Sequence, residues 1–129
     1  AQRAAMRQKA EDKLARHEWQ VARFYVEKEE PLGAIERLEQ LVQEYPGSQV
    51  RRDAMLVLAR SYADVGDYAQ ARLTVDMLVD EYPGAAGSNE IAALRQRIES
   101  GLAGPPEGGD GPEAAAVPGP DGREVRSGA

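Results

Sequence analysis

The sequence predicts an all-α protein, a short α-solenoid of two helix-turn-helix repeats, a capping helix and a disordered C-terminal tail. The first observation is an internal repeat, because Tyr45-Pro46-Gly47 recurs as Tyr82-Pro83-Gly84 after 37 residues. Upstream positions match at the same spacing: Ala22 with Ala59, Tyr25 with Tyr62, Ala34 with Ala71, Leu38 with Val75 and Leu41 with Leu78. The second observation is that Gly and Pro separate stretches of good helix formers.

The residue spacing within each repeat resembles that of tetratricopeptide (TPR) repeats. The second repeat keeps the consensus positions Tyr62, Gly66, Tyr68, Ala71 and Pro83. The first repeat departs from it, with Glu29 where Gly is usual and Pro31 in the place of Tyr68. We therefore predict a TPR-type α-solenoid, in which stacked hairpins share one core.

Small residues mark where the two helices of a hairpin must approach each other. Ala22 and Ala34 take these positions in the first repeat, and Tyr25 and Leu38 fill the space around them. A single hairpin cannot bury such an apolar seam, so the second hairpin and a capping helix are needed. By the same argument we expect Tyr62 and Leu78 to be buried.

The predicted helices cover about residues 2–28, 32–44, 49–65, 68–81 and 88–102. Local signals support their ends: Pro31 suits a first helical turn, Gly66 suits a left-handed helix exit, and Asp67 with Gln70 forms a capping-box pattern. Ser48 and Ser88 are the predicted N-caps of the third and fifth helices. The fifth helix carries one apolar stripe and a polar outer face, which is typical of a cap.

Composition changes abruptly at residue 104. Of the 26 residues from 104 to 129, 12 are Gly or Pro, and the acidic residues outnumber the basic ones by five to two. Such a segment buries too little apolar surface to offset the entropy of ordering its backbone. We predict a helical domain at 1–103 and a disordered acidic tail at 104–129, which we interpret as a solubilising extension, with a partner-binding tail as the alternative.

Charge and motif content exclude several classes of function. The net charge of −6 argues against nucleic-acid binding, since a phosphate-binding domain normally shows a dominant basic face. The chain has no Cys and a single His, His17, so we expect no metal site. Phosphate loops, nucleophile elbows, HExxH motifs and calcium loops are all missing from the sequence. We therefore expect a binding module without cofactors and without enzyme activity.

The first half of the first helix is basic. It carries Arg3, Arg7, Lys9, Lys13 and Arg16 against Glu11 and Asp12. We interpret these residues as a solvated helix face, and an anionic partner or lipid headgroups are the alternative.

A closer resemblance follows from three strings in the first repeat. They are Leu14-Ala15-Arg16-His17-Glu18, Val21-Ala22-Arg23-Phe24-Tyr25 and Ala34-Ile35-Glu36-Arg37-Leu38-Glu39, followed by Tyr45-Pro46-Gly47-Ser48. Over about residues 10–85 the chain looks like the C-terminal half of the BamD (ComL, YfiO) family, TPR lipoproteins of the outer-membrane β-barrel assembly (BAM) machinery. The string HE-x-x-VA-x-FY is not part of the general TPR consensus.

The resemblance implies a scaffold at the periplasmic face of the outer membrane in a Gram-negative bacterium. It implies docking on the POTRA domains of the barrel subunit BamA and on accessory lipoproteins, with the family's docking arginine falling on Arg37. Membrane attachment would run only through an N-terminal lipidated Cys, which this chain does not contain. Because the chain opens at Ala1, we expect an upstream portion to be missing.

Two other interpretations stay open. A generic periplasmic TPR peptide receptor or adaptor would use the concave face, lined in this register by Arg16, Trp19, Arg23, Val26, Glu27, Leu56, Arg60 and Ala63. Arg23 and Arg60 occupy equivalent positions, from which they would grip a peptide carboxylate. The other interpretation, the helical module of an enzyme such as a cell-wall hydrolase, has no set of catalytic residues behind it.

Overall fold

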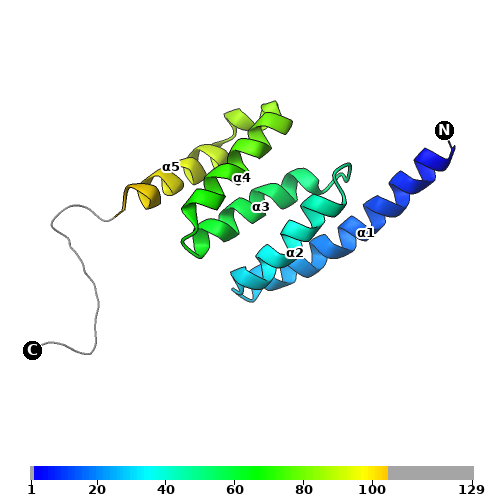
Figure 1. Ribbon diagram of the computed structural model, residues 1–129, viewed down its shortest axis with the longest axis horizontal. Helices are drawn as coiled ribbons and strands as arrows, with labels where there is room; N and C mark the ends of the chain where they lie inside the picture. The colour runs from blue at the N-terminus through cyan, green and yellow to red at the C-terminus, as the bar shows by residue number, and fades with distance from the viewer. Residues whose placement is uncertain (1, 105–129) are drawn as a thin grey trace, which may run out of the picture. The chain divides into compact units, whose positions relative to one another are not determined.

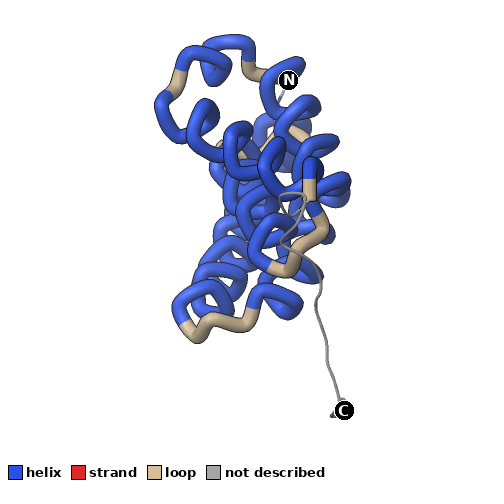
Figure 2. The backbone as a smooth tube through the Cα atoms, turned by 90° about the vertical axis from the view of Figure 1, so that its left-hand side faces the viewer, coloured by secondary structure: helices blue, strands red, loops and turns tan. Residues whose placement is uncertain are grey.

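The computed structural model describes residues 2–104, which are helical apart from short connections (Figure 1). The helices are α1 (Gln2–Glu27), α2 (Pro31–Glu44), α3 (Arg51–Asp64), α4 (Tyr68–Glu81) and α5 (Asn89–Ala103), with a 3₁₀ helix η1 (Pro83–Gly87) before α5. No strand occurs among the described residues, as Figure 2 shows. The chain divides into two units between Glu99 and Ser100, and both helical hairpins belong to the first. The all-α prediction is confirmed.

The hairpins form as the repeat predicts. Helix α1 packs against α2, α3 packs against α4, and α2 joins the two hairpins by packing against α3. The repeated small residues are fully buried where the helices meet: Ala22, Ala34, Ala59 and Ala71. A methyl group in these positions lets two helix backbones approach closely, so the larger residues of each repeat close the core around the contact.

The first hairpin has an additional close contact at Gly33. A Cβ atom placed on Gly33 would lie 2.8 Å from Cδ1 of Tyr25, well inside van der Waals distance. The Tyr25 ring therefore lies directly against the start of α2. The second hairpin has Gln70 at the equivalent position, and there Tyr62 makes a different contact.

Polar contacts fasten α3 to its neighbours. Arg51 is buried, donates from Nε to the carbonyl oxygen of Val42 in α2 at 3.3 Å, and pairs with Glu81 at the end of α4. The hydroxyl of Tyr62 donates to the carboxylate of Glu39 in α2. The Arg51–Val42 and Tyr62–Glu39 contacts cross between the two hairpins, whereas the Arg51–Glu81 pair lies within the second hairpin. These contacts satisfy polar groups that burial would otherwise leave unpaired.

Two of the predicted N-caps are confirmed and one is wrong. Asp67 accepts a hydrogen bond from the backbone N–H of Gln70 at 3.3 Å, and Ser88 accepts one from that of Ile91 at 3.1 Å. Ser48 does not cap α3, since its hydroxyl accepts from the N–H of Val50 at 3.0 Å and the helix begins only at Arg51. A local turn at Ser48 therefore replaces the expected cap.

The two hairpin turns adopt the same left-handed conformation at equivalent positions. Gly66 has φ +84°, as its role in ending α3 requires, and Glu29 has φ 57°. A left-handed conformation suits Gly and strains other residues. The departure of the first repeat from the TPR consensus is thus a change of residue type without a change of backbone path.

Helix α5 has the features expected of a cap. Its stripe of Ile91, Leu94 and Ile98 is buried. Gln96 and Glu99 are exposed at the positions where α1 has Ala22 and Tyr25 and α3 has Ala59 and Tyr62. The side of α5 that would face a further hairpin partner is thus polar and exposed among the described residues. The predicted tail at 104–129 lies, beyond Gly104, outside the described residues, and the domain boundary there stays a prediction.

Truncation of the buried Leu78 should destabilise the fold strongly. Its side chain is 1% exposed, so Leu78→Ala leaves a cavity in the second hairpin and should cost about 2–5 kcal/mol. Tyr68→Ala should cost less, because Tyr68 is only half-buried beside the turn. Urea unfolding of both variants checks this, and equal stability of Leu78→Ala and the parent would disprove the repeat register.

Tyr62 should make stability fall at high pH. Burial and the neighbouring Glu39 raise the pKa of the Tyr62 hydroxyl well above its ordinary value near 10. The folded state holds this proton more tightly than the unfolded state. The contribution of Tyr62 to the free energy of unfolding is therefore complete below pH 10 and declines as pH rises above 10. Urea unfolding between pH 9 and pH 11.5 should show a steeper loss in the parent than in Tyr62→Phe. If stability falls equally with pH in both proteins, titration of Tyr62 does not contribute to the pH dependence.

Candidate functional site

A groove on the first unit is lined by residues of α1, α3 and α5. Its volume is about 390 Å³, and its lining residues are Trp19, Arg23, Val26, Glu27, Asp53, Leu56, Val57, Arg60, Ser61, Asp64 and Glu90. The first helices of successive repeats supply these side chains. The groove therefore lies on the surface that the sequence predicted to be the concave face. Trp19, Arg23 and Arg60 are brought together, and their role in binding stays a prediction.

The two arginines of the groove have different environments. The Arg23 guanidinium lies over the Trp19 ring at 5.8 Å from its centroid, one helical turn away on α1. Arg60 pairs with Glu90 of α5 at 2.8 Å. In this structure Arg60 already contacts a carboxylate, so a peptide carboxylate would have to displace Glu90 to reach it.

Three of the four acidic residues of the groove were missed from the sequence, which had placed only Glu27 there. The lining contains four carboxylates, from Glu27, Asp53, Asp64 and Glu90, and two guanidinium groups. The 37-residue period could have identified these acids, because it makes Glu27 equivalent to Asp64 and Asp53 equivalent to Glu90. Asp64 pairs with Arg97 of α5 at 2.8 Å. The lining thus combines apolar side chains with more carboxylates than guanidinium groups.

Two residues expected on the concave face are not among those that line the groove, and for Arg16 the expectation stays a prediction. Arg16 is exposed on α1, one turn before Trp19, and is not among the residues that line the groove. Ala63 is 1% exposed, so the expectation that it lines the concave face is wrong. Its side of α3 turns into the core, next to the buried Tyr62.

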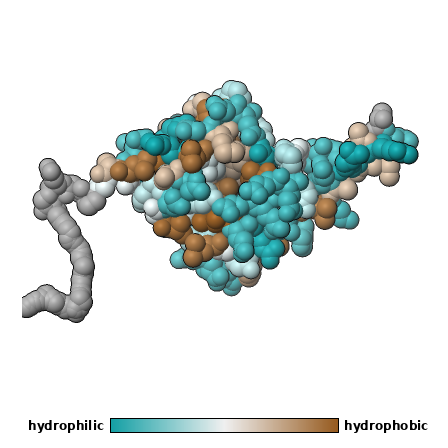
Figure 3. All heavy atoms as spheres, viewed as in Figure 1, coloured by the Kyte–Doolittle hydropathy of each residue, from teal (hydrophilic) through white to brown (hydrophobic). Residues whose placement is uncertain are grey.

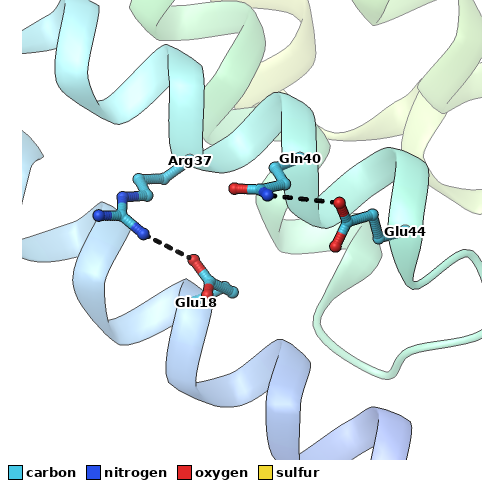
Figure 4. Close-up of polar contacts among 4 residues, drawn as sticks. All are labelled: Glu18, Arg37, Gln40 and Glu44. Carbon is cyan, nitrogen blue, oxygen red and sulfur yellow. Dashed lines mark hydrogen bonds and ion pairs between the residues drawn. The ribbon is translucent and has the colours of Figure 1, made fainter.

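Arg37 lies on a second surface, formed by α1 and α2 (Figure 4). Its Nη1 approaches Oε1 of Glu18 in α1 at 3.4 Å, and the two side chains are 40% and 22% exposed. On the same helix, Gln40 donates to Glu44 at 3.3 Å. The acid that Arg37 contacts thus lies on the neighbouring helix α1 and not on α2 itself. Glu39 instead accepts the hydroxyl of Tyr62.

The described residues contain no group of three His, Asp or Glu side chains that would hold a metal ion. None of the described helices combines the length and the apolar character that crossing a membrane requires.

Comparison with known proteins relates this chain to an outer-membrane family. The family model for YfiO, described as an outer membrane lipoprotein, matches residues 1–77. The outer membrane protein assembly factor BamD of Rickettsia prowazekii (strain Madrid E) is 31% identical over 74 residues, which make up 57% of this chain and 30% of that protein. The chain thus spans less than a third of this relative's length. No solved structure matches the chain.

Proposed function

Because this chain belongs to the YfiO family of outer membrane lipoproteins, we propose that it is a non-catalytic scaffold of outer-membrane protein assembly. The matched residues 1–77 include the first hairpin, all of α3 and most of α4, so the family likeness covers the packed hairpins themselves. The Rickettsia relative carries the name of an assembly factor, and that name supports the same role here. The site of action in this proposal is the periplasmic face of the outer membrane.

The proposed partners are BamA-like POTRA domains and other BAM lipoproteins, and the proposed contact is Arg37. The side chain of Arg37 is 40% exposed, and its single carboxylate neighbour is held at a long 3.4 Å. The pair is part-buried and its contact is long, so we expect a partner carboxylate to be able to replace Glu18. A guanidinium can then form two parallel hydrogen bonds in a drier interface.

A second candidate function is peptide binding in the groove, favoured by the partly exposed indole of Trp19 beside Val26 and Leu56. The excess of carboxylates over guanidinium groups in the lining suits a ligand that carries basic residues better than one that ends in an unpaired carboxylate. This preference for a basic ligand is opposite to the prediction that Arg23 and Arg60 bind a peptide carboxylate.

Substitution of Arg37 should separate binding from folding. Arg37→Ala should leave the melting temperature nearly unchanged. It should weaken binding to a BamA POTRA fragment at least tenfold, because removing one side of a charge pair in an interface costs about 2–5 kcal/mol of binding free energy. Arg37→Lys should rescue only in part, because Lys lacks the planar fork. Isothermal titration of the folded variants measures both effects.

Glu18→Gln is the matched control for Arg37. It breaks the same intramolecular pair but leaves the guanidinium in place. If Arg37 contacts the partner, Glu18→Gln binds at least as tightly as the parent. If both variants weaken binding equally, or if Arg37→Ala binds normally, Arg37 is not the docking residue.

The groove can be tested with Trp19, which is the only Trp of the chain. Titration with an apolar peptide carrying two Arg should shift the Trp19 emission, and the same peptide with Glu in place of Arg should bind at least fivefold more weakly. Asp53→Asn with Glu27→Gln should abolish the difference. Equal response to both peptides contradicts a charge-selective groove, and no response to either removes the peptide-binding candidate.

A further inference from the structure

A second cavity continues the groove at the turn between α1 and α2. We call it the turn cavity. Its volume is about 350 Å³, and its lining residues are Val26, Glu29, Pro31, Ser61 and Asp64. Val26, Ser61 and Asp64 also line the groove, so the two cavities adjoin. All of these residues belong to the first unit, so a ligand in the groove can extend into the turn cavity without leaving this unit.

The charged side chains of the turn cavity are both acidic. They are Glu29, from the turn, and Asp64, from the end of α3, and the lining includes no Lys or Arg among the described residues. Asp64 pairs with Arg97 at 2.8 Å, whereas Glu29 forms no ion pair with any residue that the structure describes. The adjacent Lys28 places its ammonium group over the Phe24 ring, at 5.4 Å from its centroid. The Glu29 carboxylate is thus available to a basic ligand group.

Backbone preference does not explain a glutamate at position 29. Glu29 has φ 57°, a left-handed conformation that strains residues with a Cβ atom, and the equivalent Gly66 adopts it without that strain. The side chain of Glu29 is exposed, so burial does not offset the strain. A strained residue that lines a cavity is a candidate for a role in binding. The first repeat therefore has a carboxylate where the second repeat has no side chain.

The groove beside the turn cavity supplies an apolar contact. It is lined by Trp19 and Leu56, and Val26, which both cavities share, is 41% exposed. Apolar surface near this turn is visible at the lower edge of the helical part in Figure 3.

The spacing of these features along α3 fits an extended ligand. Leu56 and Asp64 are eight residues apart on this helix, which is about 12 Å along its axis. An extended chain covers that distance in about four residues, and side chains four positions apart lie on the same side of it. The two cavities therefore fit an extended segment with a basic residue and an apolar residue four positions apart.

We propose that the turn cavity receives the side chain of a Lys or Arg in an extended segment of a partner protein, whose apolar residue packs against Trp19 in the groove. Glu29 is the specificity-determining residue, because its carboxylate can form a charge-assisted hydrogen bond with the basic group without first breaking an ion pair of the described residues. The proposal rests on the groove as a peptide-binding site and does not depend on the Arg37 contact. A divalent cation fits less well, because the described residues contain no group of three acidic or His side chains that would hold one.

The test titrates the full chain with end-blocked peptides and follows the emission of Trp19. The probe peptide carries one Arg and one Leu, four positions apart, among Ser and Gly residues, and its control has Gln in place of Arg. The parent should bind the Arg peptide at least threefold more tightly than the Gln peptide. Glu29→Gln should remove this preference. Glu36→Gln removes the same charge from an exposed site on α2 outside both cavities and should keep the preference.

Glu29→Gly separates binding from folding. It should also remove the preference for Arg, yet it should be at least as stable in urea as the parent, because Gly adopts the left-handed conformation without strain. Loss of binding in this variant then reports the missing carboxylate and not a damaged fold.

Four results would overturn the proposal. The first is an unchanged preference for Arg in both Glu29 variants, which keeps peptide binding in the groove but places the basic residue elsewhere. The second is an equal loss in Glu29→Gln and Glu36→Gln, because net charge and not the turn cavity would then govern binding. The third is displacement of the Arg peptide by millimolar Mg²⁺ at constant ionic strength, which assigns the carboxylates to a cation. The fourth is no change in Trp19 emission with any peptide, which removes the groove as a peptide-binding site together with this proposal.

Discussion

The structure depends on the close approach of two helices at a pair of alanines, made once in each hairpin. Ala22 meets the second helix near Ala34, and Ala59 and Ala71 repeat the arrangement 37 residues later, all fully buried. Larger side chains there would hold the helices apart and leave voids around Leu38 and Leu78, because interiors are packed to near-crystalline density. The hairpin geometry in turn sets the spacing of α1, α3 and α5, and hence the groove.

The period allowed most of the fold to be predicted, because a repeat constrains many positions at once. It predicted the hairpins, the burial of Tyr62 and Leu78, the left-handed turn at Gly66 and the polar cap. The error at Ser48 has a local cause, since a hydroxyl that accepts from a backbone N–H two residues on competes with the helical cap. The string Pro46-Gly47-Ser48 is compatible with both a local turn and a helical cap at Ser48, so the sequence does not distinguish them.

The site was less predictable, since its polar contacts join helices that are far apart in sequence. The Arg37–Glu18 and Arg60–Glu90 pairs depend on how whole helices are rotated, which periodicity gives only to within part of a turn. Gln96 and Glu99 make polar the side of α5 that corresponds to the α2-facing side of α1.

The most direct test of this account enlarges one alanine of the helix contact. Ala59→Leu adds three carbons where α3 meets α4, and overpacking there should lower the free energy of unfolding by about 1–3 kcal/mol or more. Ala92→Leu adds the same atoms on the exposed side of α5 and should change stability little. Urea unfolding followed by circular dichroism measures both variants. A large loss in Ala59→Leu alone is the predicted result, and equal stability of the two variants would contradict the account.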